Sequence, residues 1–162
     1  MPSAEARGWG DPDAPGYRQK NIVTITAGGI RLAVHRDIAP LFQSFCDEIV
    51  ARGYPLGGVA DDWGYANRDV RGRPGVKSNH SWGLAIDLNA TTNPMTVRHP
   101  EHANRPGHDA RGTHTDMPRW VVETGERHGL YWGGNYGSSR ADAMHFEFLG
   151  TPADARKAVA SL

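Results

Sequence analysis

Residues 78–89, SNHSWGLAIDLN, carry the clearest structural pattern in this chain. In the second half of this stretch Leu84, Ile86 and Leu88 alternate with Ala85 and Asp87, which is the period of a half-buried β-strand. We therefore expect a strand that packs its leucine and isoleucine side chains into a core. The carboxylate of Asp87 would leave that strand on the opposite face.

A second stretch, AMHFEF at residues 143–148, alternates in the same way. It places His145 and Glu147 on one face of a strand and Phe146 and Phe148 on the other. Burying an unpaired imidazole or carboxylate beside apolar packing is costly unless a partner or a metal compensates. Two strands that each present a ligand type from the face opposite their apolar residues therefore indicate a shared polar site.

Metal chemistry is one use of such a site. His80 stands in the first stretch, seven residues before Asp87, so that two histidines and one carboxylate are available. This is a three-ligand set for catalytic zinc, which keeps a fourth position for water. Asp142, three residues before His145, is near enough to line the same cavity and act as the general base.

The rest of the chain predicts one α+β domain over residues 1–162, with a mainly antiparallel sheet and flanking helices. The lead, residues 1–20, is rich in Gly and Pro and is expected to be irregular. The further elements predicted from period and turn residues are a β-hairpin over 21–34, a helix over 37–52, a strand leading into a loop over 61–75, a helix from Asp116 to Gly129 and a last helix that opens at Thr151.

Composition excludes several classes of protein. Lys plus Arg and Asp plus Glu number 18 each, so no net charge attracts the chain to nucleic acid or to a membrane surface. The one cysteine, Cys46, excludes an internal disulfide and a cysteine-rich zinc site, and it belongs to the apolar stripe of a helix. Glu5 and Asp11 stand where a secretory signal would be apolar, so we expect no signal peptide.

These motifs together resemble the superfamily of zinc D-alanyl-D-alanine carboxypeptidases and L-alanyl-D-glutamate endopeptidases. SNHSWGLAIDLN matches its Ser-x-His-x-x-Gly-x-Ala-x-Asp signature, and DAMHFEF matches its second element. The resemblance implies a hedgehog/DD-peptidase-like fold and one catalytic Zn²⁺ held by His80, Asp87 and His145. It also implies that Asp142 is the catalytic base.

The resemblance further bears on the substrate, a peptidoglycan stem peptide. Aspartate at position 142 is similar to the L-alanyl-D-glutamate branch, which includes phage lysins, whereas the carboxypeptidase branch more often has Glu there. We therefore expect a monomeric lytic endopeptidase; as a phage lysin it would be made in the host cytoplasm and act on the wall after release. A D-alanyl-D-alanine carboxypeptidase and an inactive zinc-stabilised wall-binding module are the alternatives.

Members of the family hold the scissile carbonyl or a substrate carboxylate with an arginine in a Gly-Tyr-Arg-like stretch. GYANRDVRGR, residues 64–73, departs from this pattern by inserting Ala66 and Asn67. Arg68 is therefore our candidate and Arg71 the alternate, although a surface ion pair would also explain Arg68.

Other residues near the motifs are candidates for substrate binding. Ser78 would either cap a turn or touch the substrate. Trp82 and Trp132 would either form walls of peptide subsites or pack in the core, which is the commoner fate of such aromatic side chains.

Residues 90–115 have neither helical nor strand period, and we expect this loop to flank the site. It contains four histidines: His99, His102, His108 and His114. They could form a second metal site, but their spacing fits no ligand pair on a helix or a strand, and a solvated loop is the simpler interpretation. A purely structural zinc site would instead draw its fourth ligand from them.

Overall fold

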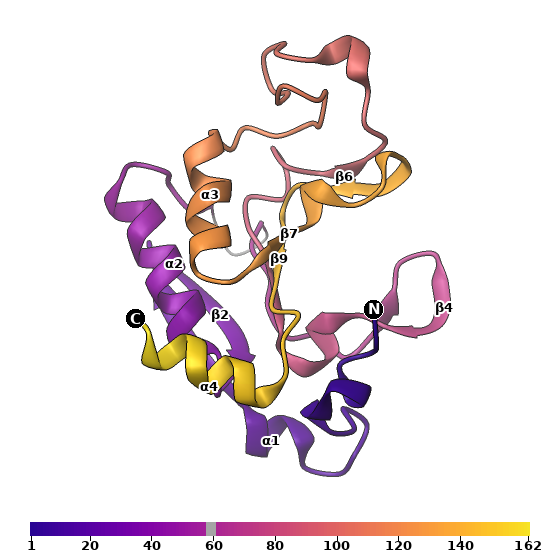
Figure 1. Cartoon of the computed structure of the whole chain (residues 1–162), viewed down its shortest axis with the longest axis vertical. Coiled ribbons are helices and arrows are strands. Elements are labelled where there is room, and N and C mark those ends of the chain that lie inside the picture. The colour runs from indigo at the N-terminus through magenta and orange to yellow at the C-terminus, as the bar shows by residue number, and fades with distance from the viewer. Residues whose placement is uncertain (58–60) are drawn as a thin grey trace.

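A three-stranded antiparallel sheet in the order β5–β9–β7 lies at the centre of the computed structural model, which describes residues 1–57 and 61–162 (Figure 1). Three other two-stranded pairs, β1–β2, β3–β4 and β6–β8, surround it. The strands are β1 Ile22–Ala27, β2 Ile30–His35, β3 Asp69–Val70, β4 Arg73–Lys77, β5 Ala85–Asp87, β6 Met95–Thr96, β7 Tyr131–Trp132, β8 Ala141–Asp142 and β9 His145–Glu147.

Among the described residues, four α-helices accompany the strands: α1 Tyr17–Asn21, α2 Ala39–Ala51, α3 Arg119–Arg127 and α4 Pro152–Ala160. The predicted α+β class and its antiparallel pairing are therefore confirmed. No helix within residues 1–57 and 61–162 is both long enough and apolar enough to span a membrane.

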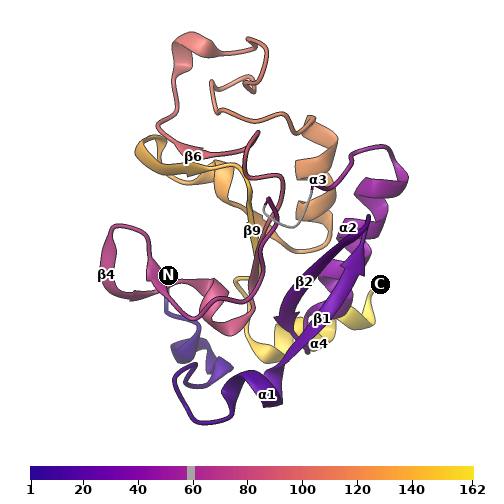
Figure 2. The ribbon, with the colours of Figure 1, turned by 180° about the vertical axis from the view of Figure 1, so that it is seen from behind.

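The predicted hairpin and the predicted helix that follows it are present as β1–β2 and α2, and they pack against each other. Gly28 and Gly29 connect the two strands with φ angles of 56° and 83°, which suits the two-residue turn of a twisted hairpin. Helix α2 lies against this hairpin (Figure 2) and buries an apolar stripe that includes Phe42 and Phe45. The rings of Phe45 and Phe146 are 4.8 Å apart, so the helix also packs against β9.

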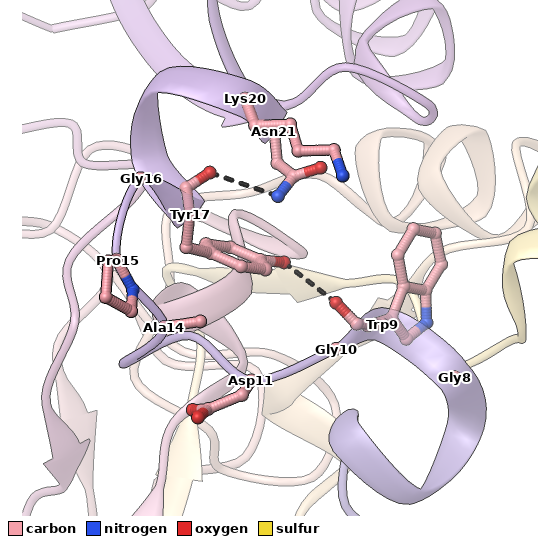
Figure 3. Close-up of a pocket in the computed structure, with 10 residues that line it drawn as sticks. All are labelled: Gly8, Trp9, Gly10, Asp11, Ala14, Pro15, Gly16, Tyr17, Lys20 and Asn21. Carbon is pink, nitrogen blue, oxygen red and sulfur yellow. Dashed lines mark hydrogen bonds between the residues drawn. The ribbon is translucent and has the colours of Figure 1, made fainter.

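The prediction of an irregular lead over residues 1–20 is wrong in part. Residues Glu5–Trp9 form a π-helical turn and α1 begins at Tyr17. The indole of Trp9 is buried, and its Nε1 donates to the carbonyl of Gly150 at 2.9 Å. The lead encloses a pocket lined by its own residues 8–21, where the Tyr17 hydroxyl donates to the Trp9 carbonyl (Figure 3). Anchoring by single aromatic side chains, rather than by a periodic apolar pattern, explains why the sequence did not predict these short helices.

This anchoring gives a stability prediction. Replacing Trp9 by alanine removes a side chain that is 4% exposed and packs edge-on against Phe148. The free energy of unfolding should fall by about 3–5 kcal/mol. Trp63, 46% exposed, is the matched control, and Trp63→Ala should change stability by less than about 0.5 kcal/mol. Urea unfolding of both variants measures this; equal losses would contradict the role assigned to Trp9.

One region differs from its predicted form. Residues 61–75, expected as a strand and a loop, contain a single bridge between Trp63 and Asp87 and then the hairpin β3–β4. Residues 90–115 are mostly irregular, as expected. This region contains β6, which pairs with β8 from a later part of the chain. It also contains an isolated antiparallel β-bridge between His108 and His114.

Candidate metal centre

The segment before β5 places His80. Residues Asn79–Trp82 form a 3₁₀-helix, η2, and β5 follows within the predicted strand. Ser78 caps this turn by accepting from the His80 amide, and the left-handed Gly83 (φ 70°) ends it. A Cβ on Gly83 would lie 2.5 Å from the backbone nitrogen of His35, so only glycine fits there. Of the two roles considered for Ser78, the structure supports the cap.

His80 is buried, and a backbone carbonyl oxygen contacts its Nδ1 atom. Its Nδ1 lies 2.7 Å from the carbonyl oxygen of Gly64. Gly64 itself lies so close to β2 that a Cβ would come within 2.1 Å of the Ala33 carbonyl oxygen. Because the Nδ1 hydrogen of His80 would donate to this carbonyl, Nε2 is left to act as a ligand.

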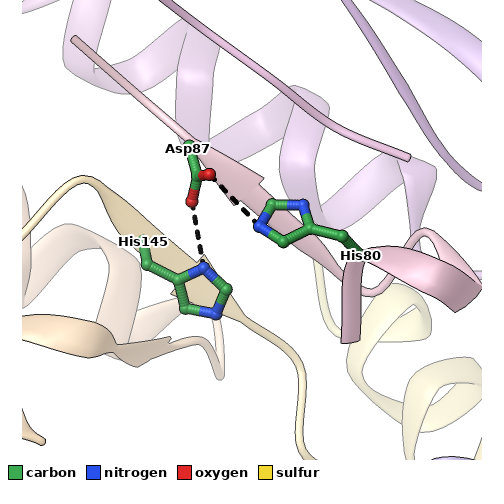
Figure 4. Close-up of side chains that lie close together, drawn as sticks. All are labelled: His80, Asp87 and His145. Carbon is green, nitrogen blue, oxygen red and sulfur yellow. Dashed lines mark hydrogen bonds and ion pairs between the residues drawn. The ribbon is translucent and has the colours of Figure 1, made fainter. Parts of the chain in front are cut away.

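Asp87 and His145 face each other across the sheet. They are direct partners in the β5–β9 register, and Asp87 Oδ1 lies 3.0 Å from His145 Nδ1 (Figure 4). Asp87 Oδ2 lies 3.2 Å from His80 Nε2. All three side chains are buried, and each offers a ligand atom within 4.8 Å of the other two. We call this the His–Asp–His group.

Charge in this group is balanced internally. Burial by itself would raise the pKa of Asp87, but attraction to His80 and the hydrogen bond from His145 lower it below its usual range. Burial would lower the pKa of His145, yet its hydrogen bonds to Asp87 and Glu147 hold that pKa well above 6.5. A proton on His145 therefore compensates the carboxylates, and a cation bound between the ligand atoms would displace that proton.

The donor set fits zinc. Two imidazole nitrogens and one carboxylate are ligands that this ion commonly takes in catalytic sites. Within the part of the chain that the structure describes, His80 Nε2 is buried without a hydrogen-bond partner of good geometry, as expected for an atom that binds a metal. Among the described residues, none of the loop histidines belongs to this group, so nothing supports the purely structural zinc site.

Glu147 is a site residue for which we predicted no role from the sequence. Its Oε2 lies 3.2 Å from His145 Nε2 and accepts from Asn79 Nδ2 at 2.5 Å, while the Tyr136 hydroxyl donates to Oε1. Burial opposes ionisation, but the hydrogen bond from His145 and its positive charge lower the pKa of Glu147 to about 2. The alternation of HFEF had already placed His145 and Glu147 on one face, and that was the available signal.

Asp142 lies beside the group on β8, where it pairs with Met95. Its Oδ1 is buried and has no hydrogen-bond partner among residues 1–57 and 61–162. Burial raises the pKa of this carboxyl, and attraction to His145 only partly opposes the rise. Gly133 passes close to both residues: a Cβ there would lie 2.5 Å from the Asp142 carbonyl oxygen and 2.9 Å from His145 Cβ.

The two candidate arginines lie on an exposed hairpin. Arg68 donates from Nη1 to the carbonyl of Asp69 at 3.3 Å, and its side chain faces solvent. Arg71 is also exposed, and its carbonyl accepts from the Arg140 guanidinium. Neither guanidinium has a hydrogen bond to the His–Asp–His group in the part of the chain that the structure describes.

Both tryptophans proposed for substrate binding are buried. Trp82 is 2% exposed and donates to the Gly10 carbonyl, and Trp132 is 3% exposed and donates to the Ala143 carbonyl. Both indoles belong to the hydrophobic core. The structure therefore supports the core-packing alternative for Trp82 and Trp132 and does not support their role as subsite walls.

An α+β fold that brings two histidines and an aspartate together in a buried group, with a further carboxyl beside it, has the arrangement of a mononuclear metal centre in a hydrolase. Comparison with protein families agrees: a family model described as D-alanyl-D-alanine carboxypeptidase matches residues 71–148. The match includes His80, Asp87, Asp142 and His145.

This match over residues 71–148 supports the superfamily of zinc peptidases that the motifs predicted. It supports a DD-carboxypeptidase-like peptidase. Comparisons with curated proteins and with solved structures gave no match.

Proposed function

We propose that this protein is a zinc-dependent endopeptidase that hydrolyses peptidoglycan stem peptides at the L-alanyl-D-glutamate bond, as a cell-wall lytic enzyme. The observation that carries the proposal is the buried His–Asp–His group with the unpartnered carboxyl oxygen of Asp142 beside it. The choice of bond is supported by aspartate, rather than glutamate, at position 142. The same feature favours a phage endolysin as the biological role.

His80, Asp87 and His145 would hold the ion. When bound there, zinc supplies Lewis acidity, which makes water easier to deprotonate and a peptide carbonyl easier to attack. Asp142 would take the proton of the attacking water and deliver it to the leaving amine. Its raised pKa suits this task, because a carboxyl whose pKa lies closer to neutral returns a proton more readily.

Arg68 would supply positive charge to the substrate. Its guanidinium is exposed and is held within the protein by one carbonyl at 3.3 Å. A substrate carboxylate or a developing oxyanion can replace such a weak contact without breaking a buried ion pair. Arg71, on the same hairpin, is the alternate.

Glu147 would position His145 for the ion. A carboxylate on the far nitrogen of a ligating imidazole fixes the ring and raises its basicity, and loss of such a partner weakens metal binding by roughly 10–100-fold. Glu147→Ala should therefore weaken zinc binding by that factor, and Glu147→Gln, which keeps one acceptor, should weaken it less. Competition with a chromogenic chelator measures both affinities. Equal affinity in Glu147→Ala and the wild type would show that His145 needs no such support.

A synthetic stem peptide tests the choice of bond. Mass spectra of the products should show a new amino terminus at D-glutamate. The description of the matching family favours a second candidate, a D-alanyl-D-alanine carboxypeptidase, which would release the terminal D-alanine instead. An intact peptide in the presence of the zinc-loaded protein would favour the third class, a wall-binding module without activity.

A further inference from the structure

Four histidines outside the His–Asp–His group lie in contact with one another. His99, His102, His108 and His114 form a row in which successive ring centroids are 5.1, 5.0 and 5.0 Å apart. We call them the four-histidine cluster. The loop that carries them projects from the end of the molecule where β6 lies (Figures 1 and 2).

This loop keeps its shape without an apolar core. Among the described residues, the hydrophobic core includes Leu88 and then Met117, and nothing between them. Backbone hydrogen bonds fold the loop back on itself: Asn104 donates to Asp109 at 2.9 Å, and Asp109 donates to Thr113 at 2.9 Å. The four-histidine cluster therefore connects the two sides of this folded-back loop, which buries almost no apolar surface.

The spacing of the rings suits a shared metal ion. Two imidazoles that bind one ion, each through a nitrogen at about 2.0–2.1 Å, have ring centroids roughly 5 Å apart when the ligand arrangement is tetrahedral. The two histidines of the His–Asp–His group, His80 and His145, show the same centroid distance, 5.0 Å. Each neighbouring pair in the four-histidine cluster matches this separation.

Hydrogen bonds at the Nδ1 atoms of two of these rings also favour metal binding. His99 Nδ1 lies 3.0 Å from Glu101 Oε1, and His108 Nδ1 lies 3.2 Å from the Pro106 carbonyl oxygen. A ring whose Nδ1 hydrogen donates to such an oxygen keeps the lone pair of Nε2 for a metal, which is the usual arrangement around ligating histidines. His80 has this arrangement with Gly64.

We propose that the four-histidine cluster is a second metal site, which takes a divalent transition-metal ion of the zinc, nickel and copper kind. An all-imidazole ligand set selects these ions over magnesium and calcium. Three ligand atoms do not yet converge here, since the His–Asp–His group alone meets that condition among the described residues. His99 is 49% exposed and the other three rings are half-buried, so side-chain rotation can bring the nitrogens together without moving the core.

Counting bound zinc tests this proposal. The metal-free full chain, titrated with Zn²⁺ against a competing chelator, should bind two equivalents. The double variant His102→Ala/His108→Ala should bind one, and so should His80→Ala/His145→Ala. Val97→Ala, at an exposed site in the same loop, is the matched control and should keep two. A single equivalent in the wild type, or two equivalents in His102→Ala/His108→Ala, would overturn the proposal.

Proteolysis gives a second readout that does not depend on activity. Arg111 is exposed within the loop, and trypsin should cut after it more slowly when Zn²⁺ connects the two sides of the loop. The wild type and His80→Ala/His145→Ala should show this protection, and His102→Ala/His108→Ala should lose it. Cleavage rates that zinc does not change in any variant would contradict the site. Failure of the proposed peptidase activity would leave both readouts intact, so the two proposals are separable.

Discussion

Asp142→Ala should lower the rate of peptide hydrolysis by roughly 10²–10⁴-fold and leave zinc bound as tightly as in the wild type. Asp142 lies on β8, outside the His–Asp–His group, and its buried Oδ1 has no hydrogen-bond partner in the described part of the chain whose loss would disturb the ligands. The variant therefore removes proton transfer without removing a ligand. Turnover of a stem peptide and zinc affinity, measured on the same preparation, check both halves of this prediction.

Two companions sharpen that experiment. Asp142→Asn keeps the shape of the side chain but cannot accept a proton at neutral pH, so its activity should match that of Asp142→Ala. Asp47→Asn removes a carboxylate from the exposed side of α2 and should leave the rate unchanged. Normal turnover in Asp142→Ala would mean that another group serves as the base.

Asp87→Ala should abolish both zinc binding and hydrolysis. Asp87 contacts both histidines, with its two oxygens at 3.2 and 3.0 Å from His80 and His145. Loss of a direct ligand should weaken zinc binding more than the roughly 100-fold that loss of a supporting residue can cause. Activity should fall to background at zinc concentrations that saturate the wild type.

Asp62 provides a matched control for this variant. It is also a buried aspartate, but its Oδ1 accepts from the Asn89 amide and it stands outside the His–Asp–His group. Asp62→Asn keeps the shape of the side chain and an oxygen that can accept from the Asn89 amide, so it should keep zinc binding and activity. Tight zinc binding in Asp87→Ala would contradict the assignment of the ligands.

The alternation of residues predicted the centre of this molecule because one face of each strand is buried. It placed Asp87 and His145 on the faces opposite their apolar neighbours, and the structure pairs these two residues directly across β5 and β9. Alternation is a local property, so it could not establish that the two strands are neighbours. The family motif supplied that link, and the same motif brought in His80 from a helical turn.

Features that depend on single long-range contacts could not be predicted from the sequence. Trp82 stands in the zinc motif, yet its indole points to Gly10 in the amino-terminal lead, whose fold no periodic pattern indicates. Glu147 has its role only because Asn79 and Tyr136 converge on it from separate segments. The four loop histidines meet because backbone turns fold the loop back, which their spacing along the chain does not reveal.

Incubation of purified peptidoglycan with the zinc-loaded protein, with and without a chelator, tests whether this protein is a zinc-dependent endopeptidase of the cell wall. Hydrolysis should release fragments whose new amino terminus is D-glutamate, the chelator should stop it, and added zinc should restore it. Unchanged stem peptides both with and without the chelator would contradict the account.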